Sequence, residues 1–162
     1  MWQDAGFLTG KPDVKAAMKQ LDHYIETLPE RYGALSEEVM RQFSAPGKWS
    51  RLQVLGHLVD SAINNLKRFT DIQVSPQPYT VQAYQQNELV TINNYQDLPL
   101  AHVLLLWQLL NQQIIYIAAN IPAEKLHYPV NPQYRNNEMK TLAWLICDYV
   151  AHMEHHIKQE FS

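Results

Sequence analysis

The sequence predicts an all-α protein, a four-helix bundle with long crossover connections. Four long segments carry apolar side chains at helical spacing, and no segment alternates apolar and polar residues as a half-buried strand does. The segments that join these helices are long enough to cross the bundle. The chain has 162 residues and no internal repeat, so we expect a single domain spanning residues 1–162.

The first two long helices are expected at residues 13–35 and 50–72. Pro29 is expected to interrupt or kink the first of them. Ser36 can cap a short helix, residues 44–47 form a turn, and Ser50 caps the second long helix. The buried face of that second helix is expected to hold Leu52, Leu55, Leu58, Val59, Ala62, Ile63, Leu66 and Phe69.

In the second half, residues 74–78 are extended and broken by proline, and Thr80 caps a short helix through Gln86. The other long helices are expected at residues 98–120 and 141–161, with a loop over residues 127–137 between them. The helix over 98–120 is apolar on more than one side, which indicates deep burial or a homodimer. We expect the homodimer.

Composition excludes several classes of protein. The formal charge is −3 with a pI of about 6.1, and no basic stripe is present, which argues against a nucleic-acid partner. The first residues do not look like a signal peptide, and the apolar run of residues 103–107 is too short to span a bilayer. A single cysteine, Cys147, fits a reducing cytoplasm, and its apolar neighbours favour a small buried side chain over a nucleophile.

Three histidines carry the chemistry. His152 and His156 lie four apart on the last helix, so both imidazoles can aim at one point. With His57 from a facing helix they would form a three-nitrogen metal site that keeps a coordination position open, as catalytic sites do. The pair alone also fits a solvated helix face. Glu154 is rotated about 200° from His152, so it does not match a zincin base.

A line of polar residues follows His57 along its helix. Asp60, Asn64 and Arg68 fall near one face together with Ser61, and such a line is costly to bury unless it borders a cavity or is fully paired. On the last helix, Asp148 is likewise a polar residue close in sequence to the two histidines. We therefore take Asp60, Asn64, Arg68 and Asp148 as candidate catalytic residues. The tyrosines of the long connections either wall a pocket or anchor loops: Tyr79, Tyr84, Tyr95, Tyr128 and Tyr134.

At this point the chain resembles the DinB/YfiT-like superfamily of metal-binding four-helix bundles. The matching pieces are residues 47–50 and 54–61, then Asn64, Arg68-Phe69, Pro78-Tyr79, and residues 149–157. The resemblance implies that His57, His152 and His156 bind nickel or zinc. The chain looks most like the branch of bacillithiol S-transferases and metal-dependent hydrolases. That branch often has His-His where this chain has Gly56-His57, and it has Trp where this chain has Ala151.

Three functions are compatible with this site. The first is transfer of a low-molecular-weight thiol to an electrophilic small molecule, since a metal deprotonates a bound thiol near neutral pH. Arg68 would then hold a carboxylate of the thiol, Asn64 would orient it, and Asp60 or Asp148 would fix a ligand imidazole. The second is hydrolysis by a metal-bound water, with Asp60 or Asp148 as general base. The third is a metal-binding module without turnover. The first is the main prediction.

Overall fold

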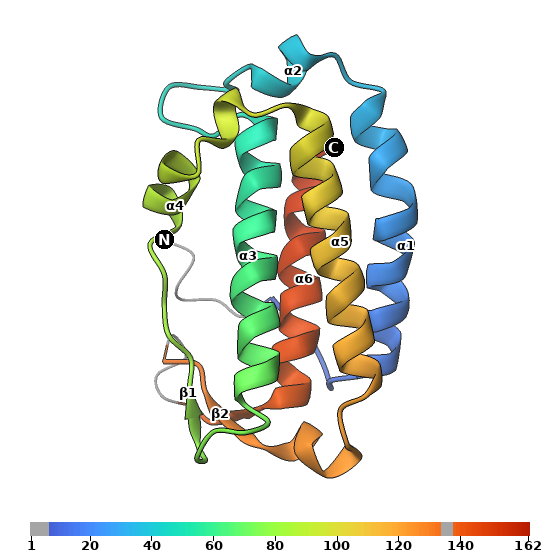
Figure 1. The fold of residues 1–162 in the computed structure, drawn as a ribbon, viewed down its shortest axis with the longest axis vertical. Coiled ribbons are helices and arrows are strands. Elements are labelled where there is room, and N and C mark those ends of the chain that lie inside the picture. Colours follow the sequence, from blue (N-terminus) through green and yellow to red (C-terminus); the bar gives the residue numbers. More distant parts are fainter. Residues whose placement is uncertain (1–6, 134–137) are drawn as a thin grey trace.

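The computed structural model describes residues 7–133 and 138–162, and four long helices form its central bundle (Figure 1). They are α1 (Val14–Gly33), α3 (Arg51–Asp71), α5 (Leu100–Ala119) and α6 (Leu142–Glu160). α1 and α6 run in one direction, and α3 and α5 run in the other (Figure 1). The main packing contacts join the helices in the cyclic order α3, α5, α1, α6. The predicted four-helix bundle is confirmed.

Short elements lie at the two ends of the bundle and beside α3. They are α2 (Glu37–Arg41), β1 (Tyr79–Thr80), α4 (Gln86–Ile92), the 3-10 turns η1 (Tyr95–Asp97) and η2 (Ala123–His127), β2 (Pro129–Asn131) and β3 (Lys140–Thr141). β2 lies in the middle of a three-stranded sheet, parallel to β1 and antiparallel to β3. The sheet therefore ties the segment after α3 to the segment before α6.

Side-chain caps explain where three of the long helices begin. Asp13 accepts a hydrogen bond from the Ala16 amide at the start of α1, and Thr141 accepts one from the Trp144 amide at the start of α6. Ser50 forms a full capping box with Gln53 at the start of α3. Each cap satisfies amide groups that have no partner within the helix.

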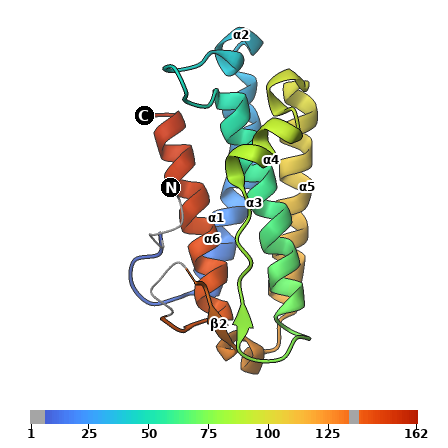
Figure 2. The ribbon, with the colours of Figure 1, turned by 90° about the vertical axis from the view of Figure 1, so that its left-hand side faces the viewer.

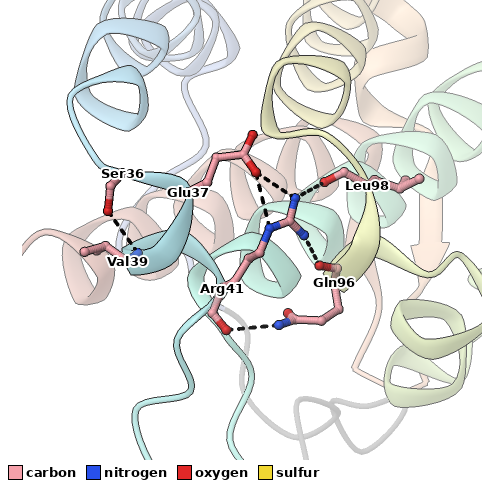
Figure 3. A network of polar contacts seen from close by, with 6 residues as sticks. All are labelled: Ser36, Glu37, Val39, Arg41, Gln96 and Leu98. Carbon is pink, nitrogen blue, oxygen red and sulfur yellow. Dashed lines mark hydrogen bonds and ion pairs between the residues drawn. The ribbon is translucent and has the colours of Figure 1, made fainter.

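The connection from α3 to α5 runs along the outside of the bundle from one end to the other (Figure 2). Figure 3 shows how its far end is fixed. Arg41 of α2 donates to the carbonyl oxygens of Gln96 and Leu98, and the Gln96 side chain donates back to the Arg41 carbonyl. The Ser50 hydroxyl donates to the Gln96 side chain at 2.6 Å. The start of α3 is thus joined to the residues that enter α5.

Two features of the connections differ from the sequence prediction. Residues 80–86 do not form a helix: Thr80 belongs to β1, and α4 begins only at Gln86. β1 is stabilised by pairing with β2, about fifty residues later in the chain, and local periodicity carries no signal of such a partner. For the same reason the predicted loop over 127–137 contains β2, while residues 134–137, with Tyr134, lie outside the described residues.

The predicted helical faces are mostly correct. Pro29 lies inside α1 without ending it, and Ile63, expected in the core, is 46% exposed. α5 buries Val103 and Trp107 but leaves Leu105, Leu109 and Tyr116 more than half exposed. By length and composition α5 is the one helix among the described residues that could cross a membrane, yet it packs on α1 and α3. A homodimer through its exposed face stays a prediction.

Candidate metal centre and adjoining cavity

The three predicted histidines meet between α3 and α6. His57 Nε2 lies 3.3 Å from His152 Nε2, and His156 Nε2 lies 3.1 Å from His152 Nε2. His57 and His156 are buried, and His152 is partly buried. One nitrogen of each ring falls within 4.8 Å of the others, so the three rings converge on a single point. The pairing of an i, i+4 couple with a histidine from the facing helix is as predicted.

This donor set fits a divalent metal ion. Two nitrogens bound to zinc at 2.0–2.1 Å are about 3.3 Å apart in tetrahedral geometry, close to the separations observed here. Burial also lowers the pKa of His57 to about 4 and that of His156 to about 3, in each case chiefly because the charged form loses its hydration. The pKa of His152 is lowered for the same reason, with the neighbouring histidines adding to the effect. All three rings are therefore neutral at pH 7, the form that binds metal.

Aromatic rings surround the histidines. Trp49 directly precedes the Ser50 cap, and its ring lies 5.0 Å from the His57 ring. The Phe7 ring lies 5.0 Å from the His152 ring. Phe7 also contacts His155, which borders the cluster without joining it. Apolar walls of this kind limit solvent access and hold the imidazoles in position. No local sequence pattern predicts the contact of Phe7 with the histidines.

Asp148 holds the N-terminal segment against the site. Its Oδ1 atom accepts hydrogen bonds from the amides of Phe7 and Leu8, at 2.5 and 2.7 Å. These partners are about 140 residues away in the sequence, so no local pattern predicts them. Asp148 also lines the cavity described below, next to His152.

A cavity of about 100 Å³ opens beside His152. α3 contributes Ser61, Asn65 and Arg68 to it, and α6 contributes Leu145, Asp148, Tyr149 and His152. Its other lining residues are Phe7, Val81, Ala83, Tyr84, Gln86 and Pro132. The cavity therefore brings together four polar residues of the two helices: Ser61, Arg68, Asp148 and His152. Of the loop tyrosines, Tyr84 walls the cavity.

The remaining two candidates lie apart from this lining. Asp60 is 2% exposed, and its Oδ1 atom accepts hydrogen bonds from Tyr95 at 2.7 Å and Asn93 at 2.8 Å. Asn64 donates to the main-chain carbonyl of Asp60, and Asn65 borders the cavity in its place. Adjacent positions on a helix point about 100° apart, so Asn64 and Asn65 face different directions. Which of the two borders the cavity can be decided only when the position of the facing helix is known.

Comparison with known proteins identifies the family of this chain. The model of the DinB superfamily matches residues 20–159, which is most of the chain. This chain belongs to the DinB superfamily. A relative from Oceanobacillus iheyensis, named "putative metal-dependent hydrolase", is 25% identical over 90% of this DinB chain and 82% of its own.

Solved structures extend the likeness to the fold. YfiT from Bacillus subtilis, described as "a probable metal-dependent hydrolase with an unusual four-helix bundle topology", aligns with a TM-score of 0.78. That alignment covers 93% of this DinB chain and 85% of YfiT at 19% identity. A Streptococcus pneumoniae protein aligns with a TM-score of 0.64 over 94% of this chain and 91% of its own, at 13% identity. The likeness to both structures concerns the fold alone. The chain is thus a DinB/YfiT-like protein with a buried three-histidine cluster suited to a metal ion.

The structure explains one departure of this DinB protein from the branch that it resembles. Where that branch often has His-His, Gly56 precedes His57, and the Tyr95 ring packs directly onto Gly56. A Cβ atom at position 56 would lie 2.2 Å from two ring carbons of Tyr95. Glycine is therefore required by the close approach of the ring that holds Asp60.

Cys147 is expected to be unreactive in the folded protein. The side chain is 3% exposed, and burial raises the pKa of its thiol to about 11, so about one molecule in a thousand carries the thiolate at pH 8. Alkylation by iodoacetamide should be at least 100-fold slower in the native protein than in urea, and the native rate should rise with pH up to about 11. Native labelling at the rate of an ordinary cysteine would contradict this and would reopen Cys147 as a nucleophile.

Proposed function

We propose that this chain is a metal-dependent hydrolase of small molecules that bind in the cavity beside His152. The observation that carries the proposal is the convergence of three neutral imidazoles, one of which, His152, lines a cavity that is also lined by a carboxylate. The names of the Oceanobacillus relative and of YfiT support the same class of reaction. Zinc or nickel is the metal that we propose for the site, because imidazole nitrogen suits both.

His57, His152 and His156 would hold the metal and leave a coordination position facing the cavity. When bound there, a divalent metal lowers the pKa of water toward 7 and polarises a carbonyl oxygen. Hydrolysis then breaks the bond between the acyl carbon and its leaving group, and the water oxygen bonds to that carbon. One water proton goes to the leaving group.

Asp148 is the carboxylate that we assign to this proton transfer. It lines the cavity with His152, whereas Asp60 accepts hydrogen bonds from Asn93 and Tyr95, which do not line the cavity. The two amides that donate to Asp148 Oδ1 fix the orientation of the carboxylate. Fixed geometry and reach to the water are what a general base requires.

Thiol transfer is the second candidate. Arg68 favours it, because a guanidinium in the cavity wall is suited to the carboxylates of a low-molecular-weight thiol. In this reaction the thiol sulfur bonds to the electrophilic carbon, the leaving group departs, and the thiol proton is released. The same three histidines would serve both reactions.

One experiment separates these functions. The zinc-loaded protein is assayed with a panel of simple esters and amides and with alkyl halides, with and without a low-molecular-weight thiol. We expect ester or amide turnover that does not depend on the thiol and is lost after chelation. Turnover only in the presence of the thiol would replace hydrolysis by thiol transfer. No turnover by the metal-loaded protein would leave a binding module.

Substituting Asp148→Asn should lower kcat for the best ester by about 10²- to 10⁴-fold, because the general base is removed. The amide oxygen of asparagine can still accept from Phe7 and Leu8, so metal content and fold should be retained. Glu154→Gln is the matched control, since Glu154 lies on the same helix and contacts Tyr24 rather than the cavity. An Asp148→Asn enzyme with wild-type kcat would exclude Asp148 as the base.

A further inference from the structure

One wall of the cavity comes from the segment that precedes α1. Among the described residues that line the cavity, Phe7 is the one from this segment, and the others belong to α3, to α6, to residues 81–86 and to Pro132. The segment passes beside α6 on the outside of the bundle (Figure 2). Phe7 is partly buried and, in the part of the chain that the structure describes, lies outside the hydrophobic core. Its substitution should therefore leave the packing of the four long helices unchanged.

The Phe7 ring lies beside the candidate metal centre. Its centre is 5.0 Å from that of the His152 ring, at an interplanar angle of 59°, and 5.2 Å from that of the His155 ring. His152 is also the histidine of the convergent cluster that lines the cavity. A molecule that occupies the cavity next to His152 must therefore contact the Phe7 ring.

Contacts other than those of the ring hold the main chain of Phe7 in this position. The amides of Phe7 and Leu8 donate to Asp148 Oδ1, and the Leu8 side chain packs against the hydrophobic core. None of these three contacts involves the Phe7 ring. A smaller side chain at position 7 should therefore leave the segment attached to α6 and remove only the wall that the ring forms.

The cavity that this wall bounds is small. Its volume is about 100 Å³, whereas a cavity of about 150 Å³ holds benzene. By proportion, the cavity takes about four non-hydrogen atoms. Cavities that bind drug-sized ligands have volumes of about 300–1,000 Å³. The part of a substrate that lies beside His152 is thus no larger than a short acyl group.

We propose that Phe7 determines the size of the acyl group that this site accepts, and that the substrates are esters or amides of short-chain acids, from acetyl to butyryl. This inference rests on the proposed hydrolase function for the cleaved bond, but selection by size can be tested separately through binding. Phe7→Ala removes a phenyl ring from the wall. The space that it leaves should accept a phenyl ring that belongs to the substrate.

The kinetic test varies the acyl group and keeps the leaving group constant. Methyl esters of acetic, butyric, hexanoic and phenylacetic acid are assayed with the zinc-loaded wild-type and Phe7→Ala proteins. We expect the wild type to prefer acetate and butyrate. Phe7→Ala should raise kcat/KM for the phenylacetate by about 10- to 100-fold, because the phenyl group is then buried, and should leave the acetate within about threefold. Phe43→Ala is the matched control, since Phe43 is 53% exposed and does not line the cavity.

The binding test needs no turnover. Butyramide and phenylacetamide, which are neutral, are compared by saturation-transfer NMR on the wild-type, Phe7→Ala and Phe43→Ala proteins. We expect Phe7→Ala to bind phenylacetamide about 10- to 100-fold more tightly than the wild type does, and butyramide with nearly the wild-type affinity. Phe43→Ala should behave as the wild type with both amides. Metal content and unfolding midpoints verify that the histidine cluster and the fold are retained in both variants.

The outcomes distinguish the two proposals. If Phe7→Ala and the wild type bind phenylacetamide equally, Phe7 does not set the size limit, and this inference is overturned even if esters are hydrolysed. Equal gains for all four esters in Phe7→Ala, acetate included, would also overturn it, because they would indicate that the segment before α1 has left the site. If the zinc-loaded wild type hydrolyses no ester, the hydrolase proposal fails. Tighter binding of phenylacetamide by Phe7→Ala would then still support selection by size.

Discussion

Replacement of His57 by alanine is expected to abolish metal binding by this protein. The wild-type protein should contain about one equivalent of zinc or nickel, because three neutral imidazoles converge within bonding geometry. Removal of one of three ligands should lower the affinity by more than about 100-fold, since even the loss of outer-shell partners costs 10- to 100-fold. Metal content of untagged protein, measured by mass spectrometry after purification and after reconstitution, checks this.

A matched variant makes the histidine result specific. His155→Ala removes a histidine that touches the His156 ring but does not belong to the convergent set, so it should retain the metal. His57→Gln keeps more of the side-chain volume and should lose the metal as His57→Ala does. Circular dichroism of each variant verifies the helical fold. Wild-type metal content in His57→Ala, or none in the wild type after reconstitution, would reject the metal centre.

Gly56→Ala is expected to destabilise the protein although alanine is the better helix former. The new Cβ would lie 2.2 Å from ring carbons of Tyr95, a side chain that is 3% exposed and whose hydroxyl donates to Asp60. The ring or the α3 backbone must therefore move, at a cost of about 1–3 kcal/mol, against a gain of at most about 1 kcal/mol from helix propensity. Denaturant unfolding of the two proteins gives the net change.

Gly33 provides the control for this substitution. It lies in the last turn of α1, and a Cβ atom there would meet nothing within 4 Å. Gly33→Ala should therefore be neutral or slightly stabilising. Gly56→Ala should also be better tolerated in a Tyr95→Ala background, where the obstructing ring is absent. Equal unfolding free energies for Gly33→Ala and Gly56→Ala would show that the Tyr95 ring yields without cost.

The three-histidine cluster was predictable because its geometry is mostly local. His152 and His156 share a face by the periodicity of a single helix, and the polar line that begins at His57 marks the facing surface of α3. The four-helix bundle was predictable because four segments each carry an apolar face at helical spacing. The Ser50 cap marks the start of α3, and that cap is also visible in the sequence.

What surrounds the metal centre was decided by contacts between distant segments. Phe7 and Leu8 reach Asp148, Tyr95 fills the space above Gly56, and β1 pairs with β2. No periodic pattern in the sequence predicts these contacts, because each depends on where a connecting segment lies after the helices have packed. Asn65 rather than Asn64 borders the cavity for the same reason: the spacing places both near one face, and only the position of α6 selects between them. The sequence by itself thus determined the helices and the three histidines that converge between α3 and α6. The tertiary structure decided the shape and the charges of the cavity in which a substrate would bind.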